Sequence, residues 1–493
     1  MEKQVVLLTG ASGSMGFEAF RLLWEKRDRY DIVLLLRPSR KNRRLFAPYL
    51  RQAGHADHGK DHKDHLKTSR GKGPAVEWSS GLKIVWGDAL NREDIVEACR
   101  GIDWCLHCMA MISPAADRDP DRAHLINTRA TQWIVEAIEA QDPGRIRMIY
   151  IGSVAMYGDR RPPFHTGRTG DPLLPSTFDH YAISKIRGEL AVMESSIRHR
   201  ASLRQTFIMI PRLFSLMDPI MFHQPIDSFM ENITARDAGR ALVACLELGD
   251  ESDFWGKFYN LSGGPSCRTT FLEFMDRIYR LLGMDYRRVM ERRWFALRNF
   301  HMQFFEDGHI LDRYLHHWNG GQTLEDYYRE VLRSFHPSLR AVARLNCRLP
   351  PFRRMVELAT RLQLRSLALK KEGTLRWIRE NDRFMIAAFY GSVEEFRAIP
   401  GWDTGMPDLD HGQVFRRLDH GYDESKTELA IDDLRKAAEF RGGALVSDQW
   451  DGDLYQQLAW KCECGHHYYM SPNSVLRGGH WCMECLNLRP GPF

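Results

Sequence analysis

Short apolar runs alternate with helix-like segments through the N-terminal part of the chain. Runs that are apolar throughout are typical of strands buried on both faces of a parallel sheet. The segments between them, such as 17–26, have the spacing of amphipathic crossover helices. This alternation predicts an α/β fold built on a doubly wound parallel sheet. The predicted strands are Val5–Leu8, Asp31–Leu36, Leu82–Trp86, Asp103–His107 and Arg147–Ile151.

A glycine-rich turn follows the first predicted strand. Glycines there permit a tight turn and let a cofactor pyrophosphate reach bare backbone N–H groups at the N-terminus of the next helix. We therefore expect the turn to bind a dinucleotide, and an ordinary strand–turn–helix is the alternative. The turn has the pattern T-G-x-x-G-x-x-G and consists of Thr9, Gly10, Ala11, Ser12, Gly13, Ser14, Met15 and Gly16.

The residue after the second strand, Arg37, indicates which dinucleotide binds. It lies 21 residues after Gly16, where an acidic side chain would bind the ribose 2′-hydroxyl of NAD, whereas arginine suits the 2′-phosphate of NADP. We therefore expect NADP(H) rather than NAD(H), and a solvated basic loop is the other interpretation. Further basic residues follow at Arg40, Lys41, Arg43 and Arg44.

A tyrosine and a lysine four residues apart form the candidate catalytic pair. Tyr181 and Lys185 share one face of a predicted helix, and Ser153 lies 28 residues before Tyr181 at the end of a strand. A lysine ammonium beside a phenol lowers the pKa of the phenol, which lets the tyrosine exchange a proton with a substrate hydroxyl near neutral pH.

These motifs together resemble those of the extended short-chain dehydrogenases/reductases, the NAD(P)-dependent epimerase/dehydratase group, from Met1 to about Ser334. The resemblance implies a Rossmann sheet with a small substrate-binding lobe, formed mainly by 207–232 and 265–335. The motifs that carry it are TGASGSMG (9–16), GDAL (87–90), HCMA (107–110), NTRAT (127–131), GSVAMYG (152–158), YAISK (181–185), SLRQT (202–206), ITARDAGRAL (233–242) and FYNLSGG (258–264).

The resemblance also implies roles for single residues. Ser153 would bind the substrate oxygen, Tyr181 would act as acid and base, and Lys185 would hold the nicotinamide ribose. Asp88 would meet the adenine and Ala110 would lie at the cofactor. In the same way, Asn127 would order the region around the active-site helix.

Two departures from the family pattern bear on the substrate. The loop between SLRQT and ITARD is only about 26 residues long and is rich in Met, Phe and Pro, which is short for a nucleotide-sugar pocket. Cys108-Met109 stands where the family usually has Leu-Ala. Both departures favour a more apolar or smaller substrate. The aromatic stretch 294–305, with His301, is expected to serve packing.

Two segments interrupt the enzyme-like pattern. Residues 51–74 are polar and Gly-rich, which indicates a mobile insertion whose four histidines are solvated. Beyond His336, Leu339–Arg348 and Phe352–Lys371 read as helices with apolar residues on one side and arginines on the other. Three interpretations stay open for them: packing on the catalytic domain, peripheral membrane contact through 339–371, or docking of a partner. A linker is expected around 401–421.

Four cysteines in the C-terminal tail predict a zinc site. Cys462, Cys464, Cys482 and Cys485 form two knuckles, C-x-C and C-x-x-C, and four thiolates suit tetrahedral zinc. His466 is the reserve ligand in place of Cys464, because C-x-x-G-H is a known variant of such a half-site.

The tail resembles treble-clef zinc ribbons with the pattern A-x-x-x-G-G…L-x-W-x-C-x-x-G-H…G-x-W-C-x-x-C. Such ribbons often accompany nucleic-acid-binding proteins. This copy carries several acidic residues and forms no basic surface, so we expect a structural or protein-binding role rather than nucleic-acid binding. The expected divisions of the chain are 1–335, 336–425 and 426–493.

Composition sets further limits. Of 493 residues, 43% are hydrophobic and 27% charged, as in ordinary globular proteins, and the net charge is +5. Six scattered cysteines favour reduced thiols, and neither a signal peptide nor a membrane-spanning run is seen, so we expect a cytoplasmic protein. The sequence leaves a homodimer open.

Two functions follow from these observations. The first is an NADP(H)-dependent oxidoreductase or epimerase/dehydratase that acts at a hydroxyl or carbonyl carbon of a small organic substrate. The second is a regulator that binds NADP(H) and whose zinc module binds a partner or nucleic acid. The Ser/Tyr/Lys set favours the first function, because a sensor does not need it.

Overall fold

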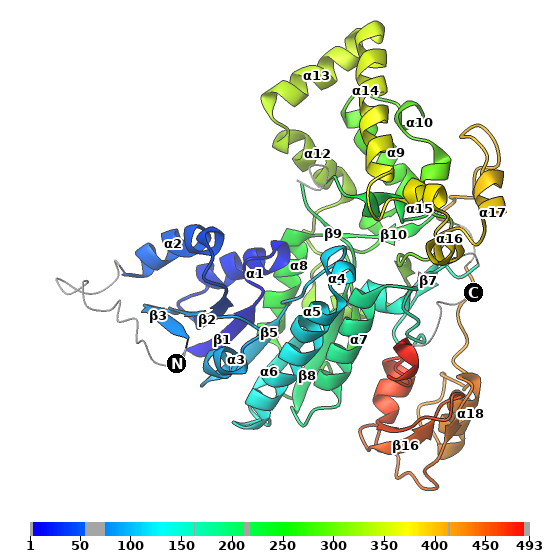
Figure 1. The fold of residues 1–493 in the computed structure, drawn as a ribbon. Coiled ribbons are helices and arrows are strands. Elements are labelled where there is room, and N and C mark those ends of the chain that lie inside the picture. Colours follow the sequence, from blue (N-terminus) through cyan, green and yellow to red (C-terminus); the bar gives the residue numbers. More distant parts are fainter. Residues whose placement is uncertain (1–2, 55–73, 162, 212–216, 413–414, 488–493) are drawn as a thin grey trace.

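The computed structural model describes residues 3–54, 74–161, 163–211, 217–412 and 415–487 (Figure 1). An eight-stranded sheet of order β12-β8-β6-β5-β1-β2-β4-β3 forms its centre. All neighbours are parallel except the β3–β4 pair, which confirms the doubly wound α/β fold. The strands are β1 (Gln4–Thr9), β2 (Tyr30–Leu36), β3 (Ala75–Ser79), β4 (Leu82–Trp86), β5 (Trp104–His107), β6 (Arg147–Ser153), β8 (His199–Gln205) and β12 (Phe258–Leu261).

Alternating side chains of the strands enter two hydrophobic layers. In β1, Val6 and Leu8 belong to one layer and Leu7 to the other, as the two-residue period of a strand requires. Helices α1 (Ser14–Glu25), α2 (Arg40–Gly54) and α8 (Ala235–Ala244) contribute to the first layer. Helices α3 (Arg92–Cys99), α6 (Ala130–Glu139) and α7 (His180–Met193) flank the second. The sheet is therefore covered on both faces.

Edge strand β3 was not expected from the sequence. Its side chains are exposed or half-buried and include Glu77, so it lacks the apolar run that marked the central strands. Helix α2 extends through Gly54, and residues 55–73, which hold most of the predicted insertion and its histidines, lie outside the described part of the chain.

A second lobe sits beyond the carboxyl ends of the strands. It contains β9 (Ile208–Met209), β10 (Phe229–Glu231), β13 (Arg268–Thr270), α9 (Phe271–Leu281), α10 (Tyr286–Val289) and α12 (Leu324–Ser334). Thr270 and Glu273 form a capping box that starts α9. These elements lie within 207–232 and 265–335, the segments that were expected to form the second lobe.

The basic segment folds onto this lobe. Helices α13 (Pro337–Arg348) and α14 (Pro350–Ala368) rise from it in Figure 1. Leu364, Leu367 and Ala368 of α14 belong to the hydrophobic core of the lobe, together with Phe271 of α9. One face of α14 therefore packs on the catalytic domain, which is the first of the three interpretations. Three short helices that the sequence did not predict follow: α15 (Thr374–Glu380), α16 (Arg383–Phe389) and α17 (Val393–Ala398).

The C-terminal tail forms a small module around helix α18 (Ile431–Phe440) and a three-stranded antiparallel sheet. The strands are β15 (Ala444–Leu445), β16 (Leu458–Lys461) and β17 (His467–Met470). The module packs against the sheet domain: Arg204 of β8 donates to the carbonyl of Gly478, and Asn473 donates to the carbonyl of Gly256 at 3.0 Å. In the described residues, no helix is both long and apolar enough to cross a bilayer.

Candidate active site

The glycine turn after β1 has the geometry of an anion cradle. Gly10 has a φ of +75°, and a Cβ at this position would lie 2.8 Å from the backbone nitrogen of Met109. A Cβ on Gly16 would lie 2.2 Å from the carbonyl oxygen of Gly10, so both positions require glycine. Helix α1 begins at Ser14 without a side-chain cap and has no acidic residue in its first turn. Its N–H groups are therefore available to a pyrophosphate, which fits a dinucleotide.

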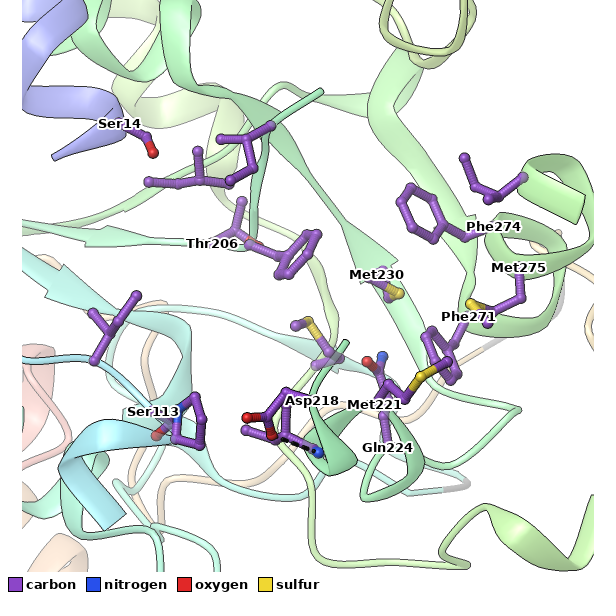
Figure 2. Close-up of a pocket in the computed structure, with 18 of the residues that line it drawn as sticks. Ser14, Ser113, Thr206, Asp218, Met221, Gln224, Met230, Phe271, Phe274 and Met275 are labelled. Atoms are coloured by element: carbon purple, nitrogen blue, oxygen red, sulfur yellow. Dashed lines mark hydrogen bonds between the residues drawn. The ribbon is translucent and has the colours of Figure 1, made fainter. Parts of the chain in front are cut away.

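A single cavity of about 770 Å³ unites most of the predicted site residues. Figure 2 shows part of its wall, from Ser14 beside the glycine turn to Phe274 and Met275 on α9. The residues from the sequence-based prediction that line it are Gly10, Gly13, Ser14, Met15, Gly16, Ala110, Ser153, Tyr181 and Lys185.

Thr9 and Ser12, both predicted to bind the cofactor, do not line this cavity. The Thr9 side chain is buried in the sheet, where its Oγ1 lies 2.7 Å from Nδ1 of His107 and accepts the backbone N–H of Met109 at 3.3 Å. Thr9 therefore joins β1 to β5, and its side chain does not face a ligand in this cavity.

Arg37 and Asp88 follow the ends of neighbouring strands of the sheet. Leu36 of β2 is paired in register with Trp86 of β4, so the residues that follow these strands meet at one edge of the sheet. Arg37 is exposed, and Asp88 is half-buried with its carboxylate accepting the N–H of Leu90 at 3.1 Å. Both residues lie outside the wall of the 770 Å³ cavity.

The structure brings the predicted catalytic set together. Ser153 is the last residue of β6, and Tyr181 and Lys185 lie one turn apart on α7, whose N-terminus Asp179 caps. All three residues line the cavity, and the hydroxyl of Ser153 lies close enough to the phenol of Tyr181 to lower its pKa. A substrate oxygen beside Ser153 would thus also meet the phenol.

The electrostatics of this pair differ from the sequence-based expectation. Burial raises the pKa of Tyr181 to about 12, against a smaller opposing effect of the Ser153 hydrogen bond. Burial also lowers the pKa of Lys185 to about 7, although Glu189 favours its charged form. Its Nζ lies 4.1 Å from the ring centroid of Tyr150. Because burial is the largest effect on Tyr181, the predicted lowering of the tyrosine pKa by Lys185 is not seen in this structure.

Asn127 fixes the loop after β5 to α7. Its Oδ1 accepts the N–H of Met111 at 2.7 Å, and its Nδ2 donates to the Met111 carbonyl and to Ser184, both at 2.9 Å. Asn127 thereby orders the surroundings of the active-site helix, in the way that the family resemblance implies.

Two further residues line the cavity that the sequence did not predict as site residues: Gln205, and His301, which was expected to serve packing. Gln205 is paired in register with Ser153, is buried, and has no partner for its Oε1 among the described residues. His301 also lines the cavity, and its Nδ1 lies 2.8 Å from the Asp179 carboxylate that caps α7. The register could have indicated Gln205, whereas His301 lies 120 residues from Tyr181 and carries no sequence signal.

The tail holds a compact group of four candidate metal ligands. Cys462, His466, Cys482 and Cys485 have ligand atoms within 4.8 Å of one another. His466 Nδ1 lies 3.4, 3.6 and 3.5 Å from the sulfurs of the three cysteines, in that order, and the sulfurs of Cys462 and Cys485 are 3.6 Å apart. Tetrahedral bonds of about 2.3 Å to sulfur and about 2.0 Å to nitrogen give ligand separations of roughly 3.5–3.8 Å. The spacing therefore fits zinc.

The group corrects one predicted ligand. Cys464 is exposed at the tip of the turn between β16 and β17 and is not part of the group. Gly465, with a φ of +84°, reverses the chain, and the N–H of Cys462 donates to the carbonyl of His466 at 3.1 Å. The hairpin thus places His466 beside Cys462, and His466 stands in the ligand group in place of Cys464.

Comparisons with known proteins agree with this architecture. The chain is similar to the dTDP-glucose 4,6-dehydratase DesIV from Streptomyces venezuelae with NAD and TYD bound, at 17% identity over 67% of this chain and 96% of that one, with a TM-score of 0.51. A dTDP-glucose 4,6-dehydratase from Bacillus anthracis in complex with NAD has 15% identity over 69% and 99% of the two chains, with a TM-score of 0.49. Residues 6–253, just over half of the chain, match the model of the NAD dependent epimerase/dehydratase family. The chain therefore belongs to this family of short-chain dehydrogenase/reductase-type enzymes.

Proposed function

We propose that this protein is an NADP(H)-dependent oxidoreductase or epimerase/dehydratase that acts at a hydroxyl or carbonyl carbon. The observation that carries the proposal is the convergence of Ser153, Tyr181 and Lys185 on the cavity that also meets the glycine turn. A regulator that only senses the cofactor needs no proton-transferring group at this place.

The residues of the chain have separate roles in this proposal. The N-terminus of α1 holds the pyrophosphate, and Lys185 binds the nicotinamide ribose when its amine is charged. Ser153 donates a hydrogen bond to the substrate oxygen and holds it beside the phenol of Tyr181. Tyr181 gives its proton to that oxygen during reduction and removes one during oxidation. A bound nicotinamide supplies or accepts the hydride.

The preference for NADP(H) is supported by charge at the end of β2. Arg37 is exposed beside the glycine turn and is followed by exposed basic residues of α2, and an arginine can bind a phosphate with two parallel hydrogen bonds. Helix α2 has no acidic residue in its first turn that would take this position.

The tail module is proposed to bind one structural zinc ion through Cys462, His466, Cys482 and Cys485. Three of these side chains are buried and no open coordination position is needed, which is typical of structural rather than catalytic zinc. Its packing against β8 and α7 supports a role in stabilising the catalytic domain.

The direct test follows sugar-nucleotide, steroid and acyl carbonyl compounds by the absorbance of NADPH and NADH and by chromatography of the products. The second readout is needed because an epimerase or dehydratase returns the hydride to the substrate and leaves the cofactor absorbance unchanged. We expect turnover with at least one class, faster with NADPH, and loss of turnover in Tyr181→Phe. Tight binding of NADPH without turnover of any class would contradict the enzymatic proposal and favour the regulator.

A further inference from the structure

The catalytic cavity continues well beyond the space that a nicotinamide and a reacting carbon would need. From Tyr181 it passes β9 and β10 and ends between α9, α13 and α14. Figure 2 shows Met221, Met230, Phe271 and Met275 along this distal part. Val342 and Ala343 of α13 and Leu364 of α14 close it. Its volume of about 770 Å³ lies in the upper range of small-molecule sites.

The charges along the wall do not suit a nucleotide sugar. Among the described residues that line the cavity, Lys185 is the only lysine or arginine, and it lies at the catalytic end. The carboxylate of Asp218 also lines the wall, but its charge is offset by Arg118, whose guanidinium lies 3.0 Å away. A buried diphosphate needs cationic or N–H partners to offset the loss of hydration, and the distal wall is built mainly from Met, Phe, Ile and Leu.

One buried amide offers a polar contact in this apolar surrounding. Gln224 is 94% buried, lines the cavity, and has no partner for its Nε2 among the described residues. An amide left without a partner in an apolar wall is costly, so a ligand oxygen at this point would be stabilising.

We propose that the substrate is a lipophilic alcohol or ketone. Its oxygen-bearing carbon lies at Ser153 and Tyr181, and its hydrocarbon body fills the space between α9, α13 and α14. The inference rests on the proposed function for the reaction, but the binding of an apolar body is a separate property of the cavity. Burying one methylene group changes affinity by about fourfold, so a chain-length series reports directly on this wall.

The first experiment measures binding of 2-octanone, 2-decanone and 2-dodecanone to the full chain by calorimetry. We expect the dissociation constant to fall by about fourfold per added methylene. Thr360→Trp, whose new ring would occupy the end of the cavity, should flatten the series. Ala359→Trp is the matched control, because the neighbouring Ala359 is exposed and does not line the cavity. Tyr181→Phe should keep the dependence of the dissociation constant on chain length, while its turnover is lost.

The outcomes separate the two proposals. No dependence on chain length, with turnover of hydrophilic carbonyl compounds, overturns the lipophilic substrate and leaves the enzymatic function standing. A steep series without conversion of any alcohol or carbonyl compound overturns the enzymatic function and leaves an apolar binding site. A steep series that Thr360→Trp and Ala359→Trp change equally contradicts the assigned place of the hydrocarbon body.

The outer face of α13 and α14 carries a second, independent inference. Leu349 at the junction of the two helices is 50% exposed, and Met355, Leu358 and Leu362 of α14 are 60, 58 and 60% exposed. The latter three recur with the spacing of one helix face, and exposed arginines flank them at Arg348, Arg354 and Arg365.

The charge of this region is strongly one-sided. Residues 336–379 contain eleven lysines and arginines and two glutamates. One of the glutamates, Glu357, is 2% exposed and accepts the backbone N–H of Asp285 at 3.0 Å, so it faces inward. Exposed leucines among arginines are typical of helices that lie on anionic bilayers. The inner side of the same helices closes the apolar cavity.

We infer that the outer face of α13 and α14 docks on an anionic membrane surface. The test is co-sedimentation of the full chain with phosphatidylcholine vesicles that contain or lack phosphatidylglycerol. We expect binding only with phosphatidylglycerol, weakened by salt, and a loss of at least tenfold in Leu358→Glu/Leu362→Glu. Phe384→Glu on α16 is the control, because Phe384 is 80% exposed and belongs to neither α13 nor α14.

Three results would overturn this second inference. They are no sedimentation with anionic vesicles, equal loss in the Phe384→Glu control, and a concentration-dependent dimer that the double variant abolishes. The last result, measured by analytical ultracentrifugation, would assign the face to a second copy of the chain.

Discussion

Nε2 of His480 in the tail module lies 2.8 Å from Oε2 of Glu189 on the catalytic helix α7, and both side chains are fully buried. Arg204 of β8 completes the group, with its guanidinium 2.7 and 3.1 Å from the two carboxylate oxygens of Glu189. Glu189 follows Lys185 by one helical turn, so the tail is joined to the helix that carries the catalytic pair. Met483 of the module also packs against the cluster that contains Val154 and Ile186, the neighbours of Ser153 and Lys185.

Removing the charge of Glu189 should destabilise the whole catalytic domain. Glu189→Gln keeps the shape of the side chain but leaves Arg204 buried without its counter-charge, and breaking such a pair costs about 3–5 kcal/mol. We expect this loss in the free energy of unfolding, measured by urea denaturation. Glu325→Gln, at an exposed position of α12, is the control and should change stability by less than about 1 kcal/mol. Equal effects of the two variants would show that the buried group does not stabilise the fold.

The same group makes stability depend on acid pH. Burial alone would raise the pKa of Glu189, but Arg204 and His480 lower it to about 2. Since the folded pKa lies below the ordinary value of 4.5, the stabilisation is complete above pH 4.5 and is lost as the pH falls towards 2. Thermal unfolding between pH 6 and 3 should show this decline, and it should be much shallower in Glu189→Gln. Parallel profiles of the two proteins would contradict the assignment.

Zinc content distinguishes the two possible ligand sets. Protein purified without chelator should contain one zinc ion per chain, and Cys464→Ser should keep it because Cys464 lies outside the ligand group. Cys482→Ser and His466→Ala should lose it. Because the module is packed on α7 and β8, loss of zinc should also lower the stability of the catalytic domain. A tail that made no contact with this domain would have no such effect. Elemental analysis and thermal unfolding measure both effects, and zinc loss in Cys464→Ser would restore the four-cysteine set.

Local motifs were sufficient to predict the parts of the site that are close in sequence. The apolar runs predicted the parallel strands, and the glycine turn predicted the cradle before α1. The four-residue spacing correctly placed Tyr181 and Lys185 on one face of α7. The serine at the end of β6 was found because a strand and its terminus are visible in the sequence. Each of these features depends on backbone periods that a short stretch of chain determines.

Long-range packing was not visible in the same way. His480 meets Glu189 across 291 residues, and nothing in either segment marks the pairing. The role of His466 depends on the hairpin turn at Gly465, which points Cys464 outward. The pKa of Tyr181 followed burial rather than its neighbour Lys185, because desolvation depends on the complete cavity wall. These three features depend on contacts between distant segments, so no local motif could predict them.

Cofactor choice should depend on Arg37. Replacing it in Arg37→Asp removes a charged partner of the 2′-phosphate, and a charge-assisted hydrogen bond contributes about 1.5–3 kcal/mol, which corresponds to roughly 10- to 150-fold in affinity. We expect calorimetry to show this loss for NADPH and little change for NADH. Arg51→Asp at the far end of α2 is the control for net charge. Equal affinities of the parent protein for both cofactors would refute the preference.

Turnover should depend on the phenol of Tyr181. Tyr181→Phe keeps the ring in the cavity wall but removes the proton donor, and general acid–base catalysis typically contributes about 10²- to 10⁴-fold. We expect kcat to fall by that factor on whichever substrate is found, while the dissociation constant of NADPH stays within about twofold.

Ser153→Ala should have a smaller effect, because Ser153 holds the substrate oxygen without transferring a proton. Lys185→Met should lower both turnover and cofactor affinity, since its amine lies between the phenol and the ribose in the proposed complex. Near-full activity of Tyr181→Phe would remove the phenol from the mechanism, and the buried, partly neutral Lys185 would then be the group to test as the proton carrier.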